Sequence, residues 1–201
     1  MRKATSDKSV LISVLFSLLL ITLLAGCKTQ DSYKREIEQK GMTYSVESFL
    51  NTAAAGYKET VALFLKAGTD INTRGAKGET ALMLAAVNHN IELLKFLVKK
   101  TADVNVKNND GYTALMFVAS QGDIEVAEFL ITKGADMNAQ NSDGETALML
   151  SVLHAHIGMT KMLIEKGTDV HVRNNKGTRA IEYAFLNSRI KELLRNAMAK
   201  K

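Results

Sequence analysis

The sequence predicts an all-α repeat solenoid, because three features of it recur with one fixed period. Gly78, Gly111, Gly144 and Gly177 follow one another at intervals of 33 residues. Each of the first three opens a similar run, Gly-x-Thr-Ala-Leu-Met, which leads into a second apolar stretch and then an Asp-containing turn. A fixed period of this length is typical of solenoids, whose helix pairs bury their faces only by stacking on their neighbours.

Each unit is expected to hold two helices. Thr80, Thr113 and Thr146 directly precede the first apolar stretch, where a hydroxyl can accept a hydrogen bond from the open helix N-terminus. Asn90 and Asp123 precede the second stretch and are expected to cap the second helix in the same way. The units are therefore predicted to be helix-turn-helix pairs.

The second helix of each unit shows a buried stripe and a marked end. Leu93, Phe96 and Leu97 recur at helical spacing. Glycine follows this helix in three units, where a left-handed residue is favoured: Gly68, Gly134 and Gly167. Thr101 takes this position in one unit, and a β-branched residue would be strained there if φ is positive.

These runs resemble the ankyrin repeat, which reads G-x-T-P-L-H-x-A-A, then I-V-x-x-L-L, then G-A-D-V-N. The resemblance implies helix pairs with β-hairpin fingers, in five repeats including caps. We place the repeat domain at 44–201, with repeats at 45–77, 78–110, 111–143 and 144–176 and a C-terminal cap at 177–201. In the cap, Ile190, Leu193 and Leu194 match the central second helices if two residues are missing from the inter-helix turn.

The chain departs from the family pattern at two positions. Alanine replaces the family's proline, which removes the fixed φ that favours a helix start: Ala81, Ala114, Ala147 and Ala180. Methionine replaces its histidine, and we expect these methionines, like Met162, to pack in the core: Met83, Met116 and Met149.

The first residues have the order of an export signal. Positive residues precede an apolar run that ends in small residues and a cysteine, Leu24-Ala25-Gly26-Cys27. This ending resembles the lipobox of bacterial lipoproteins, which implies a signal peptide at 1–26 and a lipid on Cys27. An uncleaved membrane helix is the alternative, since the run is barely long enough to span a bilayer. Both interpretations place the rest of the chain outside the cytoplasm.

Residues 27–43 are predicted to be the lipidated cysteine followed by a polar tether, because residues 28–43 are polar and mixed in charge. About fifteen extended residues would reach roughly 50 Å. A helical extension of the first repeat is the alternative, since the segment from Tyr33 has reasonable helix propensity.

Charge and cysteine content limit the function classes. Loss of residues 1–26 would lower the formal charge from +5 to +3, which is too even a balance to indicate nucleic-acid binding. The single cysteine allows no internal disulfide, and lipidation would leave no free thiol.

No enzymatic constellation is found. The sequence lacks a phosphate-binding loop, a dinucleotide fingerprint, a zinc-protease motif and a nucleophile elbow. His154 and His156 are the one pair that could meet a metal, but no cysteine or obvious carboxylate joins them, so we interpret them as surface residues. We expect no enzyme, no cofactor and no small-molecule substrate.

Ankyrin proteins usually bind partners through the fingers and the exposed edge of the first helices. By that resemblance the finger positions are Arg74, Lys77, Glu79, Lys107, Asn109, Asp110, Tyr112, Gln140, Asp143, Glu145, Arg173 and Lys176. The helix-edge positions are Val87, Gln121 and His154. Tyr112 is the only aromatic residue in the set and the best hot-spot candidate.

The function predicted from sequence is a lipid-anchored adaptor or scaffold that binds another protein. Lys28 follows Cys27 where an aspartate would favour inner-membrane retention, so the outer membrane facing the periplasm is expected, with the inner membrane as the alternative. Three other interpretations stay open: an inhibitor or immunity factor against a toxin or enzyme, a periplasmic helper of stress defence, and a cryptic hydrolase.

Overall fold

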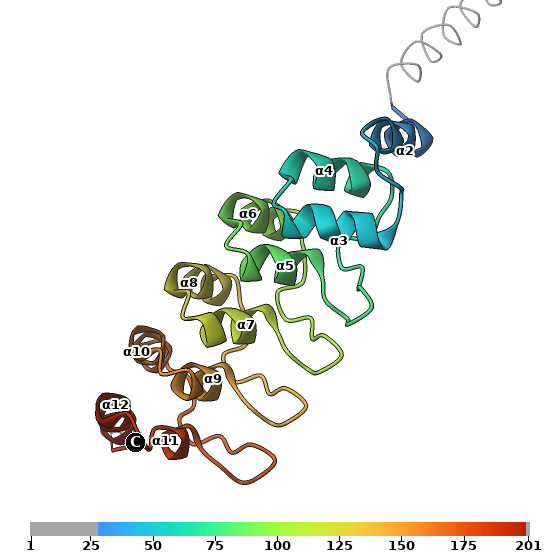
Figure 1. The fold of residues 1–201 in the computed structure, drawn as a ribbon. Helices are drawn as coiled ribbons and strands as arrows, with labels where there is room; N and C mark the ends of the chain where they lie inside the picture. The colour runs from blue at the N-terminus through green and yellow to red at the C-terminus, as the bar shows by residue number, and fades with distance from the viewer. Residues whose placement is uncertain (1–27, 200–201) are drawn as a thin grey trace, which may run out of the picture.

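A computed structural model of the chain describes residues 28–199, which fold into an elongated stack of helix pairs (Figure 1). The signal segment and Cys27 lie outside these residues. The first helices of the five pairs are α3 (Val46–Ala54), α5 (Ala81–Val87), α7 (Ala114–Gln121), α9 (Ala147–Leu153) and α11 (Ala180–Tyr183). The second helices are α4 (Lys58–Lys66), α6 (Ile91–Lys99), α8 (Ile124–Thr132), α10 (Ile157–Glu165) and α12 (Ser188–Met198). One further helix, α2 (Gln30–Gln39), precedes the first pair.

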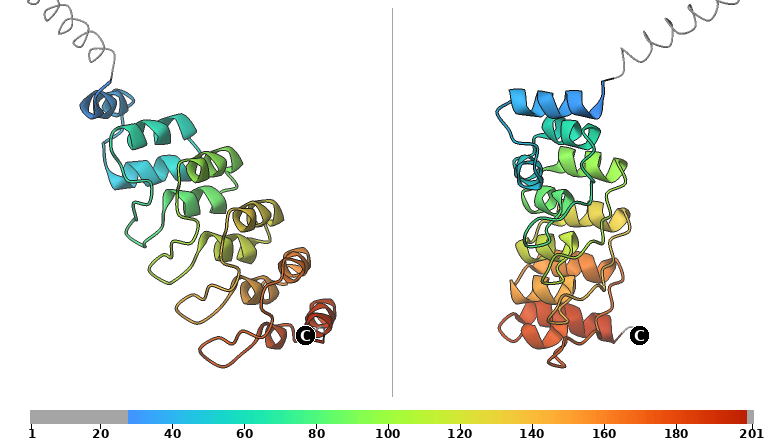
Figure 2. Two further views of the ribbon diagram at one scale, coloured as in Figure 1. Left: turned by 180° about the vertical axis from the view of Figure 1, so that it is seen from behind. Right: turned by 90° about the vertical axis from the view of Figure 1, so that its right-hand side faces the viewer.

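The helices form two layers, with the loops between pairs all on one side. The first helices pack on one another along the stack, and each also packs on the second helix of its own pair. The loops project from the first-helix layer, away from the second helices (Figures 1 and 2). The prediction of a helical repeat solenoid with five units is confirmed.

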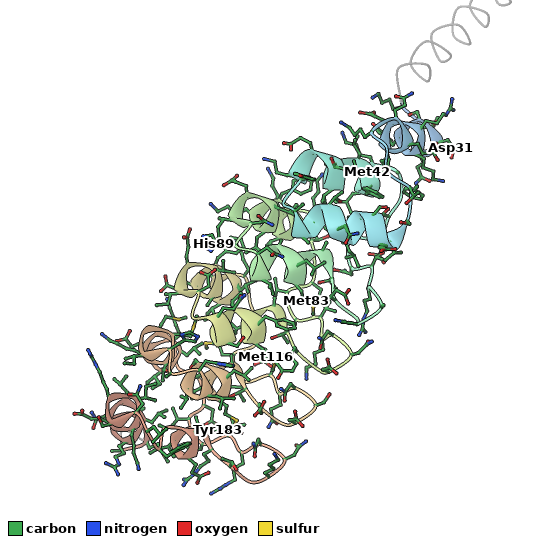
Figure 3. All side chains as sticks on the ribbon, viewed as in Figure 1. Asp31, Met42, Met83, His89, Met116 and Tyr183 are labelled. Atoms are coloured by element: carbon green, nitrogen blue, oxygen red, sulfur yellow. The ribbon has the colours of Figure 1, made fainter. Side chains whose placement is uncertain are left out.

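The core between the layers contains the methionines that replace the family's histidine. Met83, Met116 and Met149 are at most 2% exposed, and Met162 is buried as well. Figure 3 shows Met83 and Met116 on successive first helices. These side chains supply packing, as expected for unbranched apolar residues in irregular core space.

The first helices begin at the predicted caps. The hydroxyls of Thr80, Thr113 and Thr146 each accept a hydrogen bond at 3.3 Å from the amide three residues on. Each threonine is extended in its backbone, so the side chain can turn back over the helix start. The threonine pattern in the sequence thus fixes where α5, α7 and α9 begin.

The second helices follow the cap prediction only in part. Asp123 caps α8, since its Oδ1 accepts the amide of Val126 at 3.2 Å. The prediction for Asn90 is wrong, because α6 has no side-chain cap. Asn90 instead donates from Nδ2 to the carbonyl of Ala54 in the preceding pair, at 2.9 Å. Its amide therefore joins two repeats and does not cap its own helix.

Left-handed residues recur at two helix ends in each of the first four units, besides the glycines of the finger tips. Glycines after the second helices have φ between +88° and +99°, and Thr101 at the same position has φ +65°. The predicted strain at Thr101 is thus present in the backbone. The turn between the helices has a second such position, where Gly56 and Gly122 alternate with His89 (φ +54°) and Ala155 (φ +58°).

Residues 28–43 do not form the expected tether. They contain α2, capped by Thr29, and this helix packs on α4. Ile37 is fully buried there, and the nearby Tyr44 ring stacks on Phe64 with centroids 5.8 Å apart. The helical alternative is correct: Ile37 and the partly buried Tyr33 pack on the core, and most of the stability of a short helix comes from such packing.

The last unit is shortened at the position predicted. α11 has only four residues, and α12 starts at Ser188, two residues earlier in the repeat than the other second helices. Ile190 and Leu194 are fully buried and Leu193 is half-buried, which reproduces the burial of Leu93, Leu97 and Phe96 in α6.

The loops between pairs are fingers without strands. In the part of the chain that the structure describes there is no β-strand, only one isolated antiparallel bridge between Arg173 and Arg179. The expected β-hairpins are therefore absent. Each finger tip is instead closed by two backbone bonds, such as those from the Asn108 amide to the Tyr112 carbonyl at 2.9 Å and from the Gly111 amide to the Asn108 carbonyl at 3.0 Å. Further tip groups bond to side chains of the same tip or to neighbouring fingers.

Candidate binding surface

The finger tips, at 75–79, 108–112, 141–145 and 174–178, are joined into a ladder. The amides of Asn109, Ser142 and Asn175 each donate to a carbonyl of the preceding tip at 3.0 Å. The side chains of Asn109 and Asn175 add parallel bonds to Ala76 and Ser142, at 3.0 and 2.8 Å. Successive fingers are thus held in register by backbone and side-chain bonds together.

Three tips have an internal asparagine clamp. In each, the Oδ1 atom accepts two amides of its own tip, from the residues two and four positions on. The clamping residues are Asn108, Asn141 and Asn174. The first tip has Gly75 at this position, and its amide donates to the Glu79 carbonyl at 2.9 Å without a side-chain clamp.

Several of the predicted binding residues take part in this scaffold. Lys107 donates from Nζ to the carbonyl of Gln140 at 2.7 Å, and Gln140 in turn donates to the carbonyl of Arg173 at 2.9 Å. Arg74 donates to the Oδ1 of Asn109 at 3.2 Å. The Arg173 guanidinium is also used within its own finger, at 2.6 Å from a carbonyl. These polar groups hold fingers together before any partner arrives.

Two neighbouring residues are exposed at the same point of every tip, and the second of them is charged in all four. These charged residues form a single column along the stack, with two positive and two negative side chains: Lys77, Asp110, Asp143 and Lys176. Because their backbones are fixed by the ladder, their charged ends are presented at a regular spacing. We refer to these four residues as the tip column.

The helix-edge residues lie at the C-terminal ends of the first helices and do not form one column. Gln121 and His154 are exposed and occupy equivalent positions of the repeat, at the end of α7 and at the C-cap of α9. Val87 is half-buried and lies one position earlier in the repeat, where its carbonyl accepts from Gln121 Nε2 at 3.3 Å. Gln121 therefore links two repeats as well as facing solvent.

Tyr112 is held by its neighbours. Its ring stacks on that of Phe117, with centroids 5.2 Å apart, and the residue is half-buried. Burial is the main cause of the raised pKa of its phenol. A rigid ring with one polar end is suited to an interface anchor.

The two glutamates of the finger set differ in their surroundings. Glu145 accepts a hydrogen bond from the Tyr183 hydroxyl at 3.0 Å and one from Asn141 Nδ2 at 3.4 Å. Tyr183, marked in Figure 3, also receives a bond from Asn174 at 2.8 Å, and burial raises the pKa of its phenol. The carboxylate of Glu145 is thus engaged within the protein, whereas that of Glu79 is not.

A groove opens between α3 and the first finger, with a volume of about 750 Å³. We name it the first-finger groove. Sequence reasoning identified only two of its residues, because the groove depends on apolar side chains of α3 that look like ordinary core positions. Its lining consists of Val46, Glu47, Leu50, Asn51, Ala54, Arg74, Gly75, Ala76, Glu79 and Leu84.

Other chemistry was sought in the described residues. No group of three or more histidine, cysteine or acidic side chains between residues 28 and 199 could hold a metal ion. The rings of His154 and His156 are 6.2 Å apart, and His156 Nε2 lies 2.9 Å from the Ser120 carbonyl. None of the helices within this range is long and apolar enough to cross a bilayer.

A solenoid with fixed fingers and an open inner side is the architecture of a protein-binding repeat domain. A family model described as ankyrin repeats in three copies matches residues 49–141 and 115–200. These matches span well over half of the chain, which therefore belongs to the ankyrin repeat family. Members of this family typically act as non-enzymatic modules for protein-protein interaction. No curated protein matches the chain.

Proposed function

We propose that this chain is an adaptor that binds a protein partner through its fingers and the inner edge of its first helices, and that it has no enzymatic activity. The observation that supports this most strongly is the tip column. Lys77, Asp110, Asp143 and Lys176 are exposed, while the ladder fixes the backbone that carries them. A surface whose residues are ordered before binding loses less conformational entropy when a partner docks.

The charge of the tip column favours a protein over a polyanion. Two of its residues are basic and two are acidic, so the column is neutral overall. Phosphate polymers and anionic bilayers select surfaces of one positive sign. A mixed pattern instead suits a partner with complementary charges at matching positions.

The test is capture of partners from the native envelope, with the detergent-solubilised chain as bait. It is run beside a variant in which all four tip-column residues are alanine. A matched control removes two acidic and two basic exposed residues from the second helices: Glu92, Lys95, Lys161 and Glu165. A protein retained by the wild type and the control but lost from the tip variant supports the proposal. Equal retention by all three baits contradicts it.

We further propose that Cys27 carries a lipid and holds the chain in a bacterial envelope, at the outer membrane facing the periplasm. The lipobox-like ending Leu24-Ala25-Gly26-Cys27 and the following Lys28 support this. The mass of the N-terminal peptide of the mature protein tests it directly. Cys27→Ser is expected to move the protein out of the membrane fraction, and an unmodified cysteine in the mature chain would refute the anchor.

A further inference from the structure

Glu79 has a carboxylate oxygen with no partner. Its Oε2 is buried and receives no hydrogen bond from any residue between 28 and 199. A carboxylate gains strongly from charged hydrogen-bond donors and loses when it is shielded from water without one. The position is therefore unfavourable in the isolated chain, and a cation held against the same carboxylate from the groove that Glu79 lines would offset this cost.

The equivalent glutamate two repeats later shows what is missing. Glu145 is bonded by Asn141 and by Tyr183, which lie 4 residues before it and 38 residues after it. The corresponding residues around Glu79 are Gly75 and Phe117, which have no side-chain donor. Because both donors are replaced, the Glu79 carboxylate lacks the hydrogen bonds that Glu145 receives.

Glu79 and Gly75, which stands where the asparagine donor would be, both line the first-finger groove. A β-carbon at Gly75 would lie 2.5 Å from Glu79 Oε1 and 2.7 Å from Leu50 Cδ1, so only glycine leaves the carboxylate this close to the finger backbone. Glu47 lines the same groove. Arg74 lines it too, but its guanidinium donates to Asn109 of the next finger. The groove thus has two carboxylates and one cation directed elsewhere.

Apart from Asn51, the rest of the groove lining is apolar. Leu50 and Leu84 contribute side chains from α3 and α5, and Val46 is 43% exposed at the groove edge. An aliphatic stem that ends in a cation matches such a surface, because the stem covers apolar atoms while the charged end meets a carboxylate.

We propose that the first-finger groove binds a lysine or arginine side chain of the protein partner, with Glu79 as its counter-charge. This inference rests on the proposed function and adds the chemistry of one contact. The stem lies along Leu50 and Leu84, and the cationic end donates to the Glu79 carboxylate, which lacks the asparagine and tyrosine donors that Glu145 has.

The experiment uses the full chain in detergent micelles and random 12-residue peptides displayed on phage. Selected peptides are synthesised, and their affinities are measured by fluorescence anisotropy for the wild type, Glu79→Gln and Glu145→Gln. Each peptide is also made with its basic anchor replaced by norleucine, which keeps the stem and removes the charge. Glu145→Gln is the matched control, since that carboxylate is already bonded internally.

We expect binders with a required lysine or arginine. Glu79→Gln should weaken them roughly 10- to 100-fold, as for loss of a charge-assisted hydrogen bond. Glu145→Gln should leave the affinity unchanged. The norleucine peptide should bind the wild type as weakly as the parent peptide binds Glu79→Gln. Its own affinity should be the same for the wild type and for Glu79→Gln.

Binders without a basic anchor, or with equal affinity for the wild type and Glu79→Gln, overturn the inference. If those binders are lost from the variant that lacks the tip column, the proposed function still stands. If no specific binder is selected, the inference is overturned, and the proposed function loses support as well.

Discussion

Replacement of Thr101 by glycine should stabilise the protein. Thr101 is exposed and has φ +65°, whereas Gly68, Gly134 and Gly167 at the same repeat position have φ of +88° to +99°. A left-handed backbone costs an L-residue about 1–2 kcal/mol. The greater freedom of glycine in the unfolded chain offsets about 0.5–1 kcal/mol of this. The free energy of unfolding should therefore rise by about 0.5–1 kcal/mol.

This gain corresponds to an increase of about 1–4 °C in the melting temperature. The measurement is urea and thermal unfolding of residues 28–201, followed by circular dichroism. Gly134→Thr is the reciprocal control, because a β-carbon at Gly134 meets no atom within 4 Å and only the backbone term changes. The free energy of unfolding of Gly134→Thr should fall by about the amount by which that of Thr101→Gly rises. An unchanged or lower melting temperature for Thr101→Gly would refute the strain argument.

Three further predictions concern one strained turn and two contacts between repeats. Ala155→Gly, at φ +58°, should raise the free energy of unfolding by about 0.5 kcal/mol in the same assay, and a loss would show that the alanine is not strained. Asn105→Ala removes bonds to Gly134 and Asp136 at 3.0 and 2.8 Å, and should cost about 1–3 kcal/mol in urea unfolding. His89 has its pKa raised above 6.5, first by the hydrogen bond to Asp123 and then by the charge of that carboxylate. Its stabilising effect is therefore complete below pH 6.5 and lost as the pH rises through the raised value, so urea midpoints of the wild type should fall over that window and those of His89→Asn should not.

The periodic features of the fold could be predicted because each depends on residues close in sequence. The caps at Thr80, Thr113 and Thr146 form with amides three residues on, and Thr101 shares its position with the glycines of other units. Asn90 shows the limit of this reasoning. An asparagine before a helix can bond its own helix or the preceding repeat, and the choice depends on the distance to the Ala54 carbonyl.

The site was predictable as a set of positions but not as a set of interactions. The ladder engages Lys107 and Arg74 through bonds to the next finger, which depend on how closely the fingers approach. The carboxylate of Glu79 lacks hydrogen bonds because Gly75 and Phe117 have no side-chain donor. The missing donors are recognised only when the repeats are aligned with one another and the contacts of Glu145 are known.

The docking of α2 limits how far an anchored domain could move. Only Lys28 and Thr29 separate Cys27 from this helix, and two extended residues span about 7 Å, against roughly 50 Å for the expected tether. With a lipid on Cys27, the solenoid would be confined to a thin shell above the bilayer, with its first repeat innermost. At about 10 Å per helix layer, the first-finger groove would lie within roughly 30 Å of the lipid. Binding would then depend on the distance from the bilayer at which a partner presents its binding segment, as well as on the chemistry of that segment.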